Sequence, residues 1–84
     1  MVDLIQYEPF TEEVQIAYLQ SLGQKIRSFR SYFQLSQDEL AAMAGITTRQ
    51  LIRVEKGRVN TSILVLLKIT RAMSIPLVEI IGRR

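Results

Sequence analysis

The sequence of 84 residues contains no cysteine, no histidine and no tryptophan. Without cysteine the chain has no disulfide, no zinc–thiolate site and no thiol nucleophile. Without histidine it lacks the commonest general base and metal ligand, which excludes Ser-His-Asp triads and imidazole–metal sites. Carboxylates remain, but no pattern in the sequence gathers them into a pocket. We therefore expect a protein that is not an enzyme and that uses no cofactor and no metal.

Long apolar runs are also missing. The longest unbroken aliphatic run covers residues 63–67, far below the roughly 20 residues that a membrane-spanning helix needs. The first residues have no basic group ahead of an apolar stretch, so they do not resemble a signal peptide. The hydrophobic fraction of 48% is typical of a packed globule. We expect a small cytoplasmic protein without membrane association, near the size at which a partner subunit becomes useful.

Positive charge is absent from the first part of the chain. Residues 1–20 hold four acidic residues and no Lys or Arg, whereas residues 21–84 hold all 11 basic residues against four acidic ones. The net charge of +3 therefore combines −4 with +7. We divide the chain into an acidic N-terminal extension, residues 1–20, made of an arm and the start of the first helix, and a basic domain, residues 21–84. The basic domain predicts a polyanionic partner, with nucleic acid ahead of an acidic membrane surface.

Apolar residues recur every three or four positions from Val14 onward. This spacing predicts one helix over about residues 12–33, with its apolar side chains in a single stripe. Thr11, followed by two glutamates, has the chemistry of its N-cap. Gly23 lies inside this helix and costs ~1 kcal/mol relative to alanine, so a break into two helices is an open alternative. Residues 1–10 fit an extended arm better than a helix.

Four shorter helices are expected after the first. Ser36 and Glu39 have the form of a capping box, in which each side chain accepts a backbone amide hydrogen. Thr47 has the N-cap position of the next helix, and Gly45, which tolerates positive φ, ends the helix before it. The expected ranges are 37–44, 48–56, a helix from Thr61 or Ser62 to about residue 73, and 77–81 behind Pro76. The predicted fold class is all-α, with five helices and an N-terminal extension.

The second and third helices are joined by about three residues that include a glycine, the local geometry of a helix-turn-helix. At 100° per residue, the third helix places Leu51 and Val54 on one face and four other side chains on the opposite face. Arginine pairs with guanine O6 and N7, and threonine or isoleucine packs against a thymine methyl. For Ile52, burial under the N-terminal extension is an equal alternative. The candidates for base contact are Thr48, Arg49, Ile52 and Arg53.

Contacts to the DNA backbone are expected around this face. The amides that begin the second helix, beside Gln37, have partial positive charge, and the Gln37 side chain can donate to a phosphate. Such contacts fix the protein on the duplex without distinguishing sequence. Further candidates for phosphate contact lie at the start of the third helix and in the loop after it: Thr47, Lys56, Arg58 and Asn60.

Several stretches resemble the lambda-repressor and Cro-like helix-turn-helix family, also called the xenobiotic response element type. They are residues 22–27 (LGQKIR), 35–41 (LSQDELA), 44–47 (AGIT), 51–57 (LIRVEKG) and 66–69 (LLKI), in the order and spacing of the family. The resemblance covers residues 22–81 and implies a five-helix lambda-repressor-like DNA-binding domain.

The resemblance also implies roles for single residues. Gln37 corresponds to a glutamine that contacts phosphate. Arg30 and Glu55 correspond to a pair that joins the first helix to the third and turns Arg30 toward phosphate. The positions that contact bases in the family are Thr48, Arg49 and Arg53.

Two positions depart from the family pattern. Gln34 stands where the family often has glycine between the first two helices, and Leu64 and Val65 stand where it usually has polar residues. With these residues, the fourth and fifth helices have more apolar side chains than one small core can easily bury. Two coverings are open: a twofold homodimer formed by these helices, which we expect, or the N-terminal extension through Val2, Leu4, Ile5 and Phe10.

Two hypotheses for function follow. The first is a sequence-specific DNA-binding transcriptional regulator, a homodimeric repressor or autoregulatory controller that binds a pseudo-palindromic operator on double-stranded DNA. The second is an antitoxin of a toxin-antitoxin pair, which binds a protein partner through residues 1–20 and autoregulates its operon. The extension is the candidate for that partner because it lies outside the resemblance.

Overall fold

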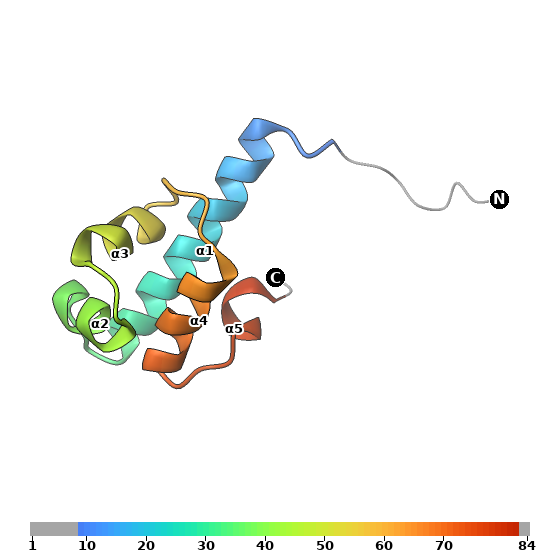
Figure 1. The fold of residues 1–84 in the computed structure, drawn as a ribbon. Helices are drawn as coiled ribbons and strands as arrows, with labels where there is room; N and C mark the ends of the chain where they lie inside the picture. Colours follow the sequence, from blue (N-terminus) through green and yellow to red (C-terminus); the bar gives the residue numbers. More distant parts are fainter. Residues whose placement is uncertain (1–8, 83–84) are drawn as a thin grey trace.

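A computed structural model describes residues 9–82, and within that range it contains helices and no strand. The five helices confirm the predicted all-α class. In Figure 1, the other helices gather around the C-terminal half of the first. No helix of the described residues is long and apolar enough to cross a membrane. The helices are α1 (Glu12–Tyr32), α2 (Gln37–Ala44), α3 (Thr48–Glu55), α4 (Ile63–Ala72) and α5 (Val78–Ile81).

Four of the helices have an N-cap residue with a hydroxyl side chain. Each hydroxyl oxygen accepts an amide hydrogen from the first turn of its helix. At Ser36 the Glu39 carboxylate accepts the Ser36 amide hydrogen at 2.8 Å, which completes the predicted capping box. Gln50 completes a second box in the same way, accepting from the Thr47 amide at 2.8 Å. Both helices of the helix-turn-helix therefore have locally fixed starting points. The four N-caps are Thr11, Ser36, Thr47 and Ser62.

α1 is continuous through Gly23, so the alternative of a break there is wrong. A methyl group on Gly23 would collide with the backbone carbonyl oxygens of Val54 and Glu55. α1 and the end of α3 thus cross in direct backbone contact at this glycine. The missing side chain allows close helix packing rather than marking a helix boundary.

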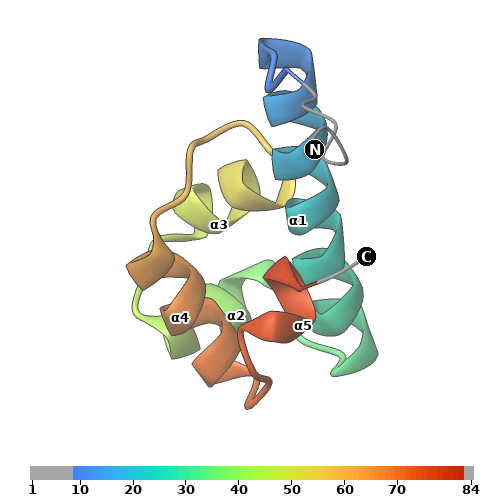
Figure 2. The ribbon, with the colours of Figure 1, turned by 90° about the vertical axis from the view of Figure 1, so that its right-hand side faces the viewer.

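The first turns of α1 extend beyond the rest of the molecule in both Figure 1 and Figure 2. Ile26 is fully buried, whereas Tyr18, two turns earlier, is 67% exposed. The predicted apolar stripe therefore faces the core only in the middle of the helix. In one of the two open alternatives Phe10 helps to cover the fourth and fifth helices; in the structure it packs beside Tyr18, with 6.0 Å between ring centroids. Val2, Leu4 and Ile5, named with it, lie outside the described residues.

The core lies where α1, α2, α3, α4 and α5 meet, and it absorbs part of the apolar surface of the last two helices. Ile80 is buried, and Val65 and Leu77 pack partly against the core. Leu64 and Val78 remain 62% and 57% exposed. The core is formed by Ile26, Leu40, Ala41, Ala44, Leu51, Val54, Leu66, Ile69, Met73 and Ile80.

Candidate nucleic-acid interface

α3 has one buried face and one accessible face. Leu51 and Val54 are 0% and 3% exposed and hold the helix against the core. On the other side Arg49 and Arg53 are exposed, and Thr48 and Ile52 are half-buried. The division predicted from the helical period is therefore observed. Base contact by Thr48, Arg49, Ile52 and Arg53 stays a prediction.

An ion pair ties the last turn of α3 to α1. Arg30 donates from Nε to Glu55 Oε2 at 2.7 Å and from Nη2 to Glu55 Oε1 at 3.1 Å. The side chains are 13% and 3% exposed. Arg30 also donates from Nη1 to the Leu35 carbonyl at 3.0 Å, which fixes the turn between α1 and α2. The expected pair is present as a two-pronged, charge-assisted contact, the geometry that arginine and carboxylate favour.

Gln37 belongs to the same network. Its Nε2 donates to Glu55 Oε1 at 3.1 Å, and its side chain is half-buried at the start of α2. This bond uses one of the two amide hydrogens of Gln37 and leaves the other for an acceptor such as phosphate. Glu55 therefore orients two residues that were predicted to contact the DNA backbone, Arg30 and Gln37.

The remaining candidates for phosphate contact lie at the two ends of α3. Thr47 is exposed, and because its hydroxyl oxygen accepts from the Gln50 amide at 3.0 Å, its hydroxyl hydrogen is available to donate. Lys56, Arg58 and Asn60 are exposed after α3. Arg30 is the most restricted of the set, because three of its N–H groups already have protein acceptors.

One residue of this surface was missed by the reasoning from sequence. Thr48 Oγ1 donates to Asp38 Oδ1 at 2.7 Å, from the first residue of α3 to the first turn of α2. In the sequence Asp38 is only an acidic residue near a helix start, where the helix dipole favours one. The packing of α2 against α3 brings its carboxylate to Thr48.

Comparison with known proteins agrees with this geometry. A family model described as helix-turn-helix matches residues 33–80. The chain belongs to the lambda-repressor and Cro-like helix-turn-helix family. This is a family of transcriptional regulators with a DNA-binding fold, not a family of enzymes.

Three similar proteins illustrate the likeness. An uncharacterized HTH-type transcriptional regulator from Archaeoglobus fulgidus is 32% identical over 56 residues, which is 67% of this chain and 79% of the relative. The restriction-modification controller protein C.AhdI from Aeromonas hydrophila has a TM-score of 0.75 at 34% identity, over 76% of this chain and 97% of its own. The hypothetical transcription factor NHTF from Neisseria has a TM-score of 0.70 at 25% identity, over 95% of this chain and 87% of its own.

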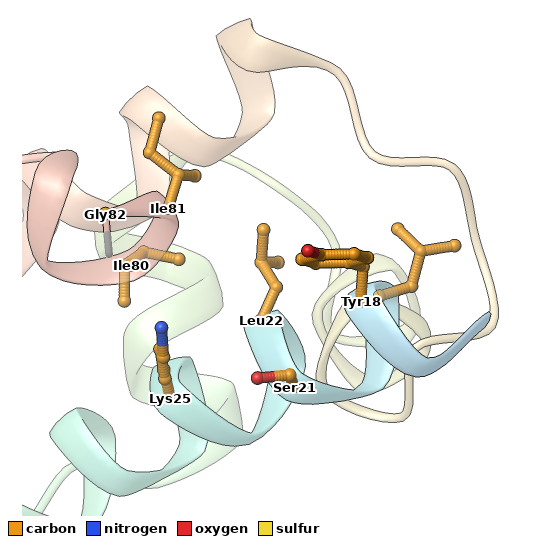
Figure 3. Close-up of a pocket in the computed structure, with 8 residues that line it drawn as sticks. Tyr18, Ser21, Leu22, Lys25, Ile80, Ile81 and Gly82 are labelled. Atoms are coloured by element: carbon orange, nitrogen blue, oxygen red, sulfur yellow. The ribbon is translucent and has the colours of Figure 1, made fainter. Parts of the chain in front are cut away.

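This helix-turn-helix chain also has an apolar recess away from α3, between α1 and α5. In Figure 3, Tyr18 and Leu22 of α1 face the recess across from Ile80 and Ile81 of α5. The recess has a volume of about 920 Å³, and among the described residues that line it Lys25 is the charged one. Most of the described side chains that line it are apolar or aromatic. It is better suited to contact with another apolar chain segment.

Proposed function

We propose that the protein is a sequence-specific transcriptional regulator, a homodimeric repressor or autoregulatory controller of a pseudo-palindromic operator. One observation carries the proposal. The exposed face of α3 holds Arg49 and Arg53, and the largely buried ion pair between Arg30 and Glu55 ties the end of this helix to α1. A helix that is packed on the core and has exposed arginines on its outer face has the chemistry of major-groove recognition.

The proposed contacts divide into two sets. Base contact involves Thr48, Arg49, Ile52 and Arg53, with the arginines suited to guanine. Phosphate contact involves Gln37, Thr47, Lys56, Arg58, Asn60 and Arg30, which flank that helix on both sides. Because counterions are released at phosphates, binding should weaken steeply as salt rises.

Exposed apolar side chains on α4 and α5 support a homodimer. Leu64 is 62% exposed, Leu67 36%, Val78 57% and Ile81 49%. Surface of this kind on neighbouring helices of a small domain is typical of protein interfaces. A twofold dimer through it would separate two α3 helices by about 34 Å, one turn of B-DNA. The same symmetry would make the operator pseudo-palindromic.

Footprinting on the DNA upstream of the protein's own gene tests the proposal. We expect protection of a two-half-site sequence, with an affinity that falls as salt is raised. Arg53→Ala should relax sequence preference at one base pair of each half-site, whereas Gln37→Ala should weaken binding to all sequences alike. Arg71→Ala, which removes an exposed arginine from α4, is the charge-matched control. Equal affinity for upstream and random DNA would contradict the proposal.

The antitoxin alternative has one supporting observation. Phe10, Ile16 and Tyr18 are 61%, 44% and 67% exposed on and just before the first turns of α1, next to the recess. This apolar and aromatic surface lies on α1 and not on the face of α3 that holds Arg49 and Arg53, so it suits a protein partner better than DNA. A toxin-like reading frame beside the gene, together with loss of complex formation after deletion of residues 1–10, would favour this function.

A further inference from the structure

We propose that Asp38 and Thr48 form one specificity element, which selects cytosine at one base pair of each half-site. The inference rests on the proposed DNA-binding function and adds a base preference to it. It starts from the bond in which Thr48 Oγ1 donates to Asp38 Oδ1 at 2.7 Å. Thr48 begins α3, the helix proposed to enter the major groove, and Asp38 is an exposed residue of α2 beside it.

The bond decides which hydrogen-bonding groups the pair offers. A threonine hydroxyl has one hydrogen and two lone pairs, and a carboxylate has only lone pairs. Since the hydroxyl hydrogen is already donated to Asp38, Thr48 Oγ1 can only accept from a further partner. The other oxygen of Asp38, Oδ2, can also only accept. The pair therefore offers hydrogen-bond acceptors and no donor.

An acceptor-only contact discriminates between bases in the major groove. Guanine presents the acceptors N7 and O6, and thymine presents the acceptor O4. Adenine presents the N6 amino group, but with the N7 acceptor next to it. Cytosine presents the N4 amino group and no acceptor on its own major-groove edge, since the neighbouring O6 belongs to the paired guanine. Cytosine is thus the base whose major-groove edge fits the pair, and a carboxylate facing guanine or thymine would be left desolvated without a donor.

The charge of Asp38 acts in the same direction. Arg49 and Arg53, on the same surface, attract any DNA, whereas a carboxylate repels phosphate and acceptor edges. Asp38 therefore lowers affinity for DNA without cytosine at this position more than it lowers affinity for the cognate site. A repulsive group of this kind increases specificity at the expense of general affinity.

The helix dipole alone would also favour an acidic residue at position 38, near the start of α2. The chain contains a second acidic residue that serves as a control for this effect of charge. Glu39 occupies the same turn of α2 and is exposed, but its carboxylate accepts from the Ser36 amide instead of from α3. Glu39→Gln removes the same charge from the same turn while keeping a side chain that can cap the helix. An effect of charge near the helix start would therefore appear equally in Glu39→Gln and Asp38→Asn.

The test selects binding sequences from a randomised duplex DNA library with the full-length protein and four variants. Each variant is first checked for native helix content by circular dichroism. We expect the wild type to select cytosine at one position per half-site. Asp38→Asn and Thr48→Val should each lower that preference about tenfold, as expected for loss of one base contact. Thr48→Ser, which keeps the hydroxyl, and Glu39→Gln should retain it.

The outcomes separate this inference from the proposed function. If the wild type selects an operator but Asp38→Asn and Thr48→Val keep its preferences, the cytosine contact is wrong and DNA recognition stands. If Glu39→Gln loses the preference as Asp38→Asn does, general electrostatics replaces the paired contact. If the wild type selects no sequence, both the inference and the proposed function are wrong. Loss of the preference in Asp38→Asn and Thr48→Val alone supports the pair.

Discussion

Gly23 shows how a neighbouring helix can decide the identity of a single residue. In an isolated helix, alanine is favoured over glycine by ~1 kcal/mol. Here the added methyl would meet the carbonyl oxygens of Val54 and Glu55, so the backbones of α1 and α3 would have to separate. We expect Gly23→Ala to lower the free energy of unfolding by about 2 kcal/mol, as forced overpacking does. Urea denaturation measures this change, and Gln24→Ala, at an exposed neighbouring position, should leave stability unchanged or slightly raised.

Glu55, on α3, joins its own helix to α1 and α2 through two side chains. Its carboxylate accepts from Arg30 and Gln37, and its side chain is 3% exposed. Glu55→Ala would leave the arginine charge nearly buried without its partner, which typically costs about 3 kcal/mol. We expect a loss of that size in the free energy of unfolding. Glu13→Ala, on the exposed first turn of α1, is the control, and a Glu55→Ala loss no larger than the control's would contradict a stabilising network.

The turn between α1 and α2 contains backbone strain that a substitution can remove. Gln34 has φ 58°, in the left-handed region where side chains are disfavoured. This agrees with the departure noted in the sequence, where the family often has glycine. We expect Gln34→Gly to raise the free energy of unfolding by about 0.5–1 kcal/mol. Glycine removes the backbone strain, and this gain should exceed the loss that comes from the greater entropy of the unfolded chain. Gln34→Ala keeps the Cβ atom and should not stabilise; equal gains in both variants would assign the effect to the lost side chain.

The elements themselves were largely predictable because their determinants are local. The Ser36 box and the periodicity of α3 depend on residues three or four positions apart, so the sequence alone located the helices and separated the two faces of α3. The bond between Asp38 and Thr48 spans ten positions and depends on how α2 crosses α3. The sequence also does not predict that Tyr18 is exposed. Periodicity indicates which face of α1 is apolar, but not how far along α1 the neighbouring helices extend.

At the scale of the whole molecule, α4 and α5 have apolar side chains that the other described residues, 9–82, leave exposed. A charge among these side chains should disrupt association without disturbing the core, because Leu64 and Val78 are 62% and 57% exposed. We expect the wild type to have a dimeric mass by light scattering, and Leu64→Glu and Val78→Glu to be folded monomers with weaker operator binding. Tyr32→Glu introduces the same charge at a residue that is 78% exposed on α1 and should remain dimeric. A monomeric wild type, with or without operator DNA, would overturn the homodimer.

The separation of charge along the chain leads to a prediction about the N-terminal extension. Deleting residues 1–10 removes Asp3 and Glu8 and changes the net charge from +3 to +5. The acidic first turn of α1 begins at Glu12, about 16 Å along the helix from Gly23 at the usual rise per residue. Gly23 is where α3 crosses α1. That distance is about twice the Debye length at physiological salt, so the acidic residues in the first turn of α1 should repel bound DNA only weakly.

We therefore expect the deletion variant to bind operator within about twofold of the full chain at physiological ionic strength, and more tightly at low salt, where screening is weaker. Titration of labelled operator at two salt concentrations measures this difference. A control that replaces Asp3 and Glu8 with Asn and Gln should reproduce the low-salt gain if charge is its cause. A large loss of affinity on deletion, absent from that control, would instead mean that residues 1–10 contact DNA or stabilise the dimer. The extension would then belong to the DNA-binding unit, and the division of the chain at residue 20 would be one of charge alone.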